Sequence, residues 1–464
     1  MNDRKKLLNN EKVSNLLLKL SAPAIAGMLI QALYNIVDTI FVGQALGDAS
    51  AQGIGGLTIA FPVQMIMAGL GLIIGIGGAS MISRNLGSNN IERAEKTLGN
   101  VILLILVFST LITLIVSFYI NPIMKAFGAT ETTLPYAVDY LRIITYGCIF
   151  FIFAMATNNI VRAEGSANIA MFTMVIAGIT NIILDPIFIF WFGWGVKGAA
   201  TATIISQFIG SLFLIYYLFS GRSIMGLHLK NLVPQFDIIK ENIAIGLSPF
   251  ARQSASSLMV VVLNNILAVY GGDVSIAVFG IINRLFMFIF MPMIGIVQGL
   301  QPIVGFNYGA RNFERVMESV RLSVIITTVM ASIGFAVLYA FPEQLFGVFS
   351  NDQALISSGE SAIRIMVLVV PLASFEFIGA TLYQSIGKAK PSFILSVSRQ
   401  VLFLIPLVII LPLYLGLEGI WIAFPISGFL SFLLSIFMMN REFKVLKGYV
   451  PDNGYEHDLQ KSTR

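Results

Sequence analysis

The chain has 464 residues, of which 56% are hydrophobic and only 11% are charged, and its formal net charge is +5. Because soluble domains carry about 25% charged residues, this composition excludes a soluble globular fold and predicts an integral membrane protein. The single cysteine, Cys148, excludes an intrachain disulfide, and the positive charge requires no nucleic-acid partner because basic cytoplasmic loops account for it.

Twelve stretches are apolar and long enough to cross a bilayer, which takes about 20 residues of helix. In chain order they lie near 15–43, 52–82, 98–120, 134–160, 168–192, 197–219, 240–270, 275–305, 317–341, 356–385, 391–415 and 418–439. They are continuously apolar rather than alternating, and they are too long for the strands of a membrane barrel. An all-α membrane protein with twelve transmembrane helices is therefore predicted.

The basic residues are distributed unevenly between the predicted loops. If the N-terminus is cytoplasmic, 22 of the 29 lysines and arginines lie on the cytoplasmic side, and only Lys125, Arg142, Lys197 and Arg364 lie on the other side. Such an excess of positive charge marks the cytoplasmic face of a membrane protein. We therefore expect a multi-pass protein with both termini in the cytoplasm.

The second half of the chain repeats motifs of the first at an offset of about 222 residues. Gly165 matches Gly387, and Arg142 matches Arg364. The repeat predicts two parallel six-helix lobes around a central cleft, because an even number of spans brings both halves into the membrane in the same direction. The predicted organisation is a cytoplasmic N-terminus (1–14), an N-lobe (15–219), a cytoplasmic linker (220–239), a C-lobe (240–439) and a cytoplasmic tail (440–464).

Ionisable residues inside the spans are the first candidates for function, because each is costly in hydrocarbon. Asp38 in the first span and Asp185 in the fifth both lie toward the outer side, and Asn181 is one helical turn from Asp185. Two buried carboxylates beside an amide suit a proton or a sodium ion, and an acid near the headgroups is the alternative for each. Asn158 and Thr203 are further candidates, with packing between helices as the alternative.

The predicted C-lobe carries a different set of charges. Glu376, Arg284 and Arg399 are expected to form a buried charge network, either structural or part of a gate, because an unpaired arginine in the membrane is untenable. If Glu376 faces the cleft, it would also attract a cationic substrate. Arg252, near the start of the seventh span, is expected to extend to the cytoplasmic interface.

Methionine and aromatic residues crowd the eighth span and include Met287 and Met291. Such adaptable side chains suit a cleft that accepts varied ligands, with packing or lipid contact as the alternative. The chain has no phosphate-binding loop of the ATPase type and no nucleophile–base pair in a span, so neither an ATP-driven pump nor an enzyme is expected. We expect no cofactor and no resident metal, and we expect a proton or sodium gradient to supply the energy.

These motifs together resemble the multidrug and toxic compound extrusion (MATE) family of secondary transporters, over about residues 14–442. The motifs that carry the resemblance are Pro23 with Asp38, Gln64 with the glycine-rich end of the second span, 159–165, 181–186, 195–207, 298–302 and 307–310. One departure concerns the seventh span. Some members carry an acid there, where this chain has Asn264 and Asn265.

The resemblance implies export of amphipathic, mostly cationic organic compounds across a prokaryotic plasma (inner) membrane, driven by inward flow of protons or sodium ions. It implies a cation site at Asp38, Asn158, Asn181, Asp185 and Thr203, and it adds Gln64 to the candidates for the substrate cleft. Because one chain holds both lobes, we expect a functional monomer whose partners are organic cations and the lipid bilayer. Broader relatives of the family keep a second hypothesis open, a flippase for a lipid-linked or anionic amphipathic substrate.

Overall fold

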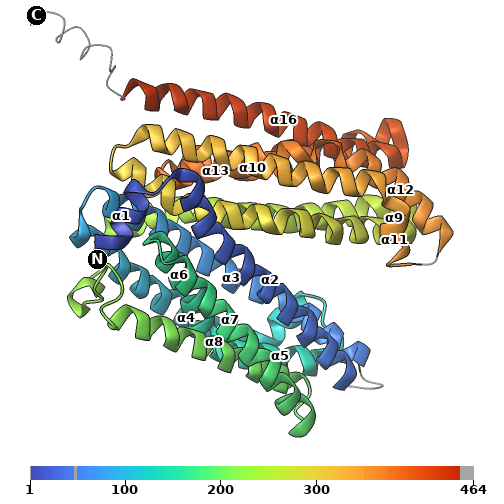
Figure 1. The fold of residues 1–464 in the computed structure, drawn as a ribbon. Helices are drawn as coiled ribbons and strands as arrows, with labels where there is room; N and C mark the ends of the chain where they lie inside the picture. Colours follow the sequence, from blue (N-terminus) through green and yellow to red (C-terminus); the bar gives the residue numbers. More distant parts are fainter. Residues whose placement is uncertain (1, 46–49, 351, 450–464) are drawn as a thin grey trace, which may run out of the picture.

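The computed structural model describes residues 2–45, 50–350 and 352–449, and this part of the chain is almost entirely helical (Figure 1). The first half contains α1 (Asn2–Asn10), α2 (Val13–Ala45), α3 (Ser50–Gly87), α4 (Ile91–Ala126), α5 (Leu134–Tyr146), α6 (Cys148–Ala163), α7 (Ala167–Pro186), the π-helical turn η2 (Ile187–Trp191) and α8 (Val196–Phe219). The second half contains η3 (Leu229–Leu232), α9 (Phe236–Gly309), α10 (Phe313–Ala340), α11 (Pro342–Gly347), α12 (Gln353–Met366), η4 (Val367–Leu372), α13 (Ala373–Ser385), α14 (Ala389–Val397), η5 (Ser398–Leu404), α15 (Ile405–Ile410) and α16 (Pro412–Gly448).

The described helices form twelve membrane spans. Ten helical stretches are long and apolar enough to cross a bilayer, and α5 with α6 forms an eleventh span that bends by 57°. The 74 residues of α9 extend to about 110 Å at 1.5 Å per residue, which is too long for one span. Because Gly272 breaks α9 with a φ of +62°, α9 supplies two spans and brings the total to the predicted twelve.

The spans pack as two bundles, which we call the N-lobe (α2–α8) and the C-lobe (α9–α16); Figure 1 shows them as blue-to-green and yellow-to-red groups. Buried residues such as Leu98 and Ile160 belong to a core that continues from the N-lobe into the C-lobe, and Ile282 and Val367 belong to a separate core within the C-lobe. At the two ends of the C-lobe, α9 begins at Phe236 and α16 continues to Gly448. Residues 450–464 of the predicted tail lie outside the described part of the chain.

The two lobes repeat one another down to single backbone conformations. Gly165 and Gly387 have φ values of +87° and +82°, and Asn89 and Arg311 have φ values of +58° and +60°. In the helices that follow, the side chains of Asn90 and Asn312 each accept a hydrogen bond from the backbone N–H three residues later. These pairs share the offset of 222 residues seen in the sequence, so the predicted internal repeat is confirmed.

Contacts between the lobes cluster in the half of the molecule that holds α1, which we call the α1 end. The Ser80 hydroxyl of α3 donates to the Gln384 carbonyl at 2.6 Å. Arg84, also on α3, forms an ion pair with Glu241 at 2.7 Å. These contacts lie at the ends of α3, α9 and α13, so they hold the lobes together at the α1 end.

Candidate functional site

The packing of α2 against α7 places two acidic residues at the same depth. The helices run in the same direction, and Gly178 of α7 lies so close to Ile30 of α2 that an added Cβ atom would lie 3.0 Å from the Ile30 side chain. Gly27 of α2 lies against Met174 of α7 in the same register. Continued along both helices, this register sets Asp38 level with Asp185, in the half of the N-lobe remote from α1.

Asp185 and Asn181 form the buried part of this site. Their side chains are 0% and 2% exposed, and Asn181 Nδ2 donates to Asp185 Oδ1 at 3.2 Å. The other oxygens, Asp185 Oδ2 and Asn181 Oδ1, are buried with no hydrogen-bond partner in the described part of the chain, as is Asp38 Oδ1. We call Asp38, Asn181 and Asp185 the carboxylate cluster. Buried oxygens left without donors favour a proton or a small cation between them.

Charge repulsion strengthens this preference. Asp38 and Asp185 lie within electrostatic range of one another, so both carboxylates cannot be ionised in a buried setting without cost. Both also lie within range of Tyr140 on α5, which is 5% exposed and accepts a hydrogen bond from Gln64 Nε2 at 3.0 Å. The sequence analysis missed Tyr140, although a buried hydroxyl in the fourth span was a usable signal. Gln64 therefore lies beside the cluster and belongs to its surroundings.

The side chains of the two other predicted cation ligands, Thr203 and Asn158, form hydrogen bonds with groups outside the carboxylate cluster. Thr203 of α8 lies near the remote end of its helix, and its hydroxyl donates to the Ala199 carbonyl at 2.9 Å. Asn158 of α6 donates to the Ala170 carbonyl at 2.7 Å and accepts from the buried Arg162 guanidinium at 2.6 Å. On α7, Ala170 is about 22 Å from Asp185 at 1.5 Å per residue. The structure thus separates Asn158 from the cluster, and its amide serves Arg162 instead.

In the C-lobe, the structure brings Glu376, which is 3% exposed, within electrostatic range of Arg399 and close to Ser431. Arg252 completes this group, and its guanidinium lies 5.4 Å from the Phe377 ring centre. Arg252 is partly exposed, so its extension to the interface stays a prediction, while the Phe377 ring and the charge of Glu376 both attract its guanidinium.

The predicted place of Arg284 in this network is wrong, because its side chain is exposed rather than buried. Arg284 lies near the middle of the second span of α9. Close to it, Met287 is 54% exposed and Met291 is half-buried. Met287 and Met291, whose side chains suit a ligand cleft, therefore lie close to the positive charge of Arg284 on α9.

Comparison with known proteins identifies the family. A family model described as MatE matches residues 23–187 and 250–410, one segment in each lobe. The chain belongs to the MatE family. A curated relative, the "Multidrug export protein MepA" of Staphylococcus saprophyticus, is 28% identical over 400 residues, which cover 86% of this chain and 87% of the relative.

Solved structures of MATE proteins match almost the whole chain. The "MATE multidrug transporter DinF-BH", solved in complex with a ligand, is 44% identical, covers 94% of this chain and 97% of its own, and gives a TM-score of 0.86. "MATE in complex with MaL6" is 29% identical, covers 97% and 100%, and gives a TM-score of 0.89. These proteins are twelve-helix transporters with two lobes, so the predicted fold class is confirmed. The MatE chain is a multi-pass membrane transporter and not an enzyme.

Proposed function

We propose that this MatE protein exports amphipathic organic cations in exchange for a proton or a sodium ion that binds at the carboxylate cluster. The observation that carries the proposal is the set of three buried oxygens, on Asp38, Asn181 and Asp185, that lack hydrogen-bond partners among the described residues. A proton would supply one donor between them. A sodium ion would take the same carboxylate and amide oxygens as ligands.

The cluster also offers a way to couple the ion to movement. Without an ion, the carboxylates of Asp38 on α2 and Asp185 on α7 repel one another. When a proton or a sodium ion lies between them, both carboxylates are attracted to it. Ion binding therefore favours close approach of α2 and α7, and ion loss favours their separation. Pro23 inside α2 removes one backbone hydrogen bond of the helix and gives α2 a point at which to bend. Substrate release follows if the bent and straight forms of α2 bind the substrate with different affinities.

Two observations support organic cations as the substrates. A relative is named a multidrug export protein, and a similar structure is described as a multidrug transporter in complex with a ligand. Exposed methionine and aromatic side chains on α9, among them Met287 and Phe288, suit ligands of varied shape. We place the protein in the bacterial plasma membrane with both termini in the cytoplasm, because its relatives are bacterial and basic residues dominate that side. We also propose that a single chain is the working unit.

The test is transport by the purified full chain in vesicles loaded with an ethidium-type dye, with a pH gradient and a sodium gradient imposed separately. We expect dye movement to follow one of the two gradients, and Asp38→Asn and Asp185→Asn to abolish the gradient dependence. Asp139→Asn is the matched control, because Asp139 neighbours Tyr140 but pairs with Lys197 at the surface at 3.2 Å. Gradient-driven movement in both cluster variants would overturn the proposal.

A second candidate function rests on the C-lobe charges. Arg252 and Arg399 face a single acid, Glu376, so this group carries an excess of positive charge. An anionic or lipid-linked amphiphile moved by flipping would complement it. Movement of a fluorescent anionic lipid rather than the dye, with loss of that movement in Arg399→Gln, would favour the flippase.

A further inference from the structure

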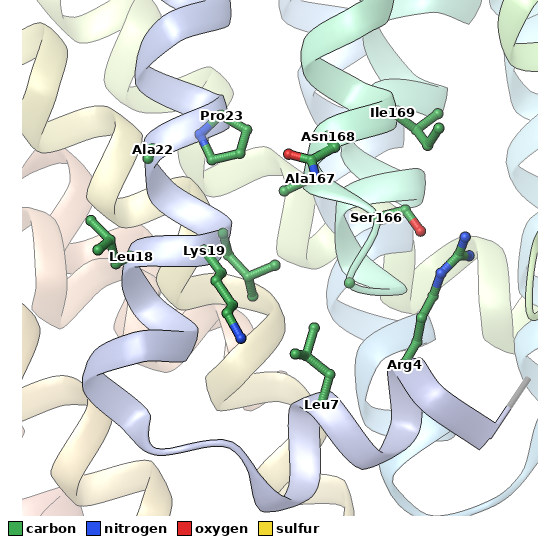
Figure 2. A pocket seen from close by; sticks show the side chains of 12 residues that line it. Arg4, Leu7, Leu18, Lys19, Ala22, Pro23, Ser166, Ala167, Asn168 and Ile169 are labelled. Atoms are coloured by element: carbon green, nitrogen blue, oxygen red, sulfur yellow. The ribbon is translucent and has the colours of Figure 1, made fainter.

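A cavity of about 740 Å³ opens at the α1 end, between α1, α2 and the start of α7 (Figure 2). Its walls come from Arg4 and Leu7 of α1, from residues 18–20, 22 and 23 of α2 and from residues 165–169. The cavity lies in the opposite half of the N-lobe from the carboxylate cluster, so it is not part of the proposed ion site. Its volume falls within the roughly 300–1,000 Å³ of cavities that hold small ligands.

The charges that line the cavity are positive. Arg4 and Lys19 are basic, and the other described lining residues are neutral. Each cation has an acidic neighbour outside the lining, because Arg4 lies 3.4 Å from Glu164 and Lys19 lies 3.1 Å from Glu11. Both cations nevertheless keep donors for a ligand, since a guanidinium has five N–H groups and an ammonium has three. Glu164, in turn, already accepts hydrogen bonds from three groups at the end of α8 and beyond, namely Tyr217, Ser223 and the Ile224 N–H.

The start of α7 adds backbone donors to the same cavity. The N–H groups of Ile169 and Ala170 bond to the Ser166 carbonyl, so Ala167 and Asn168 carry the first-turn N–H groups that have no acceptor within the helix. Ser166 does not cap them, because its hydroxyl pairs with Tyr217. Figure 2 shows Lys19 and Arg4 on opposite sides of the cavity, with the Arg4 guanidinium turned toward Ser166 and with Ala167 and Asn168 above both side chains. An anion in the cavity would be attracted by the two cations that line it and by this helix N-terminus.

The rest of the lining is apolar and continues onto the membrane-facing surface of α2. Leu18, which lines the cavity, is 67% exposed, and Leu7 and Pro23 supply further apolar walls. A free inorganic anion would leave these walls in contact with water. A phospholipid would cover them with its glycerol and the first part of its acyl chains while its phosphate reaches the cations.

We propose that this cavity binds the headgroup of an anionic phospholipid from the membrane leaflet at the α1 end. Helix α1, which forms one wall of the cavity, also contacts the C-lobe. On the far side of α1, Arg315 of the C-lobe donates to the backbone carbonyls of Leu8 and Glu11, at 3.4 and 2.8 Å. A lipid that ties α1 to α2 and α7 therefore stabilises the arrangement in which α1 bridges both lobes.

The test compares the full chain in vesicles of pure phosphatidylcholine with vesicles of phosphatidylcholine and phosphatidylglycerol in equal amounts. We expect phosphatidylglycerol to raise the Tm and to remain bound in native mass spectrometry. In the double variant Arg4→Gln and Lys19→Gln we expect roughly 25-fold weaker retention, because each basic residue near an anionic lipid surface is worth roughly fivefold in affinity. Lys5→Gln with Lys6→Gln is the matched control, since it removes the same charge without touching the cavity lining.

A second variant keeps the test decisive if loss of the Arg4 ion pair weakens folding. Ala22→Trp fills the cavity from the exposed face of α2 and leaves every charge in place. We expect it to lose the retained lipid as the double variant does. Unchanged retention in Ala22→Trp or in the charge variant would overturn the proposal. An equal rise in Tm from inorganic phosphate added to phosphatidylcholine vesicles would also overturn it, because the site would then bind a free anion.

Discussion

Asp38 and Asp185 lie level with one another on two helices that run in the same direction, and each lies within electrostatic range of the other. The sequence separates them by almost 150 positions, so only packing brings them together. Because they share one buried setting on neighbouring helices, a cation held by one acid also lies within range of the other.

The first prediction follows from that coupling. If the pair acts as one unit, Asp38→Asn combined with Asp185→Asn reduces gradient-driven dye movement no further than either single change, because the first substitution already removes the shared site. The measurement is the initial rate in vesicles for the two single variants and the double variant. Multiplicative losses would show that the two acids act separately.

The second prediction concerns the close approach of α2 and α7. Gly178→Leu introduces a side chain where even a Cβ atom would lie 3.0 Å from Ile30, so it forces the two helices apart and separates the carboxylates. We expect loss of ion-coupled transport in a protein that still folds, as judged by size-exclusion chromatography. Gly210→Ala is the control, because its Cβ would lie at an ordinary 3.5 Å from Ala177 on the other face of α7. Full coupling in Gly178→Leu would contradict the proposed role of this contact.

Local sequence signals predicted the spans and the repeat well. Span length follows from composition, and the repeat follows from turn residues such as Gly165 and Gly387, whose positive φ values few residue types adopt. Contacts between distant spans were not accessible in this way. Helix packing that no single span encodes brings Tyr140 within electrostatic range of the carboxylates and Arg252 within range of Glu376. The pairing of Asn158 with Arg162 is the exception, because their spacing of one helical turn is visible in the sequence.

The third prediction tests Tyr140. Tyr140→Phe removes the hydroxyl that accepts from Gln64 and lies within range of both acids. Because a hydrogen bond between neutral groups contributes about 0.5–1.5 kcal/mol, and this one orients a hydroxyl dipole near both acids, we expect the concentration of the coupling ion that gives half-maximal transport to change by roughly twofold to tenfold. Tyr136→Phe, one helical turn away, is the control. An unchanged ion dependence would exclude Tyr140 from the site.

The fourth prediction concerns pH and Glu164, which lies at the end of α6 and outside the spans. Burial raises the pKa of Glu164 above its ordinary value of 4.5, although hydrogen bonds from Tyr217, Ser223 and Ile224 and the charge of Arg4 oppose this effect. The folded protein therefore holds this proton more tightly than the unfolded chain does. The ionised, buried carboxyl costs stability at high pH, and this cost disappears as the pH falls to about 4.5.

The measurement is the Tm in detergent, at a series of pH values from about 4.5 upward, for the native chain and for Glu164→Gln. The glutamine keeps a hydrogen-bond acceptor but cannot ionise. We expect the difference to move in favour of the glutamine variant as the pH rises above about 4.5. A difference that moves in the opposite direction would mean that the ion pair with Arg4 outweighs burial.

The last prediction separates a structural role from a role in ion binding at Asn158. Asn158→Ala leaves the buried guanidinium of Arg162 without its acceptor at 2.6 Å. We expect a loss of about 1–3 kcal/mol in the free energy of unfolding, as for other buried polar groups left unpaired. The ion dependence of transport should stay unchanged, because Asn158 bonds to α7 at Ala170, about 22 Å along the helix from Asp185. The double variant Asn158→Ala with Arg162→Met should recover part of the stability, because it removes the unpaired charge as well. A shift in the ion dependence of Asn158→Ala without loss of stability would instead return Asn158 to the ion site.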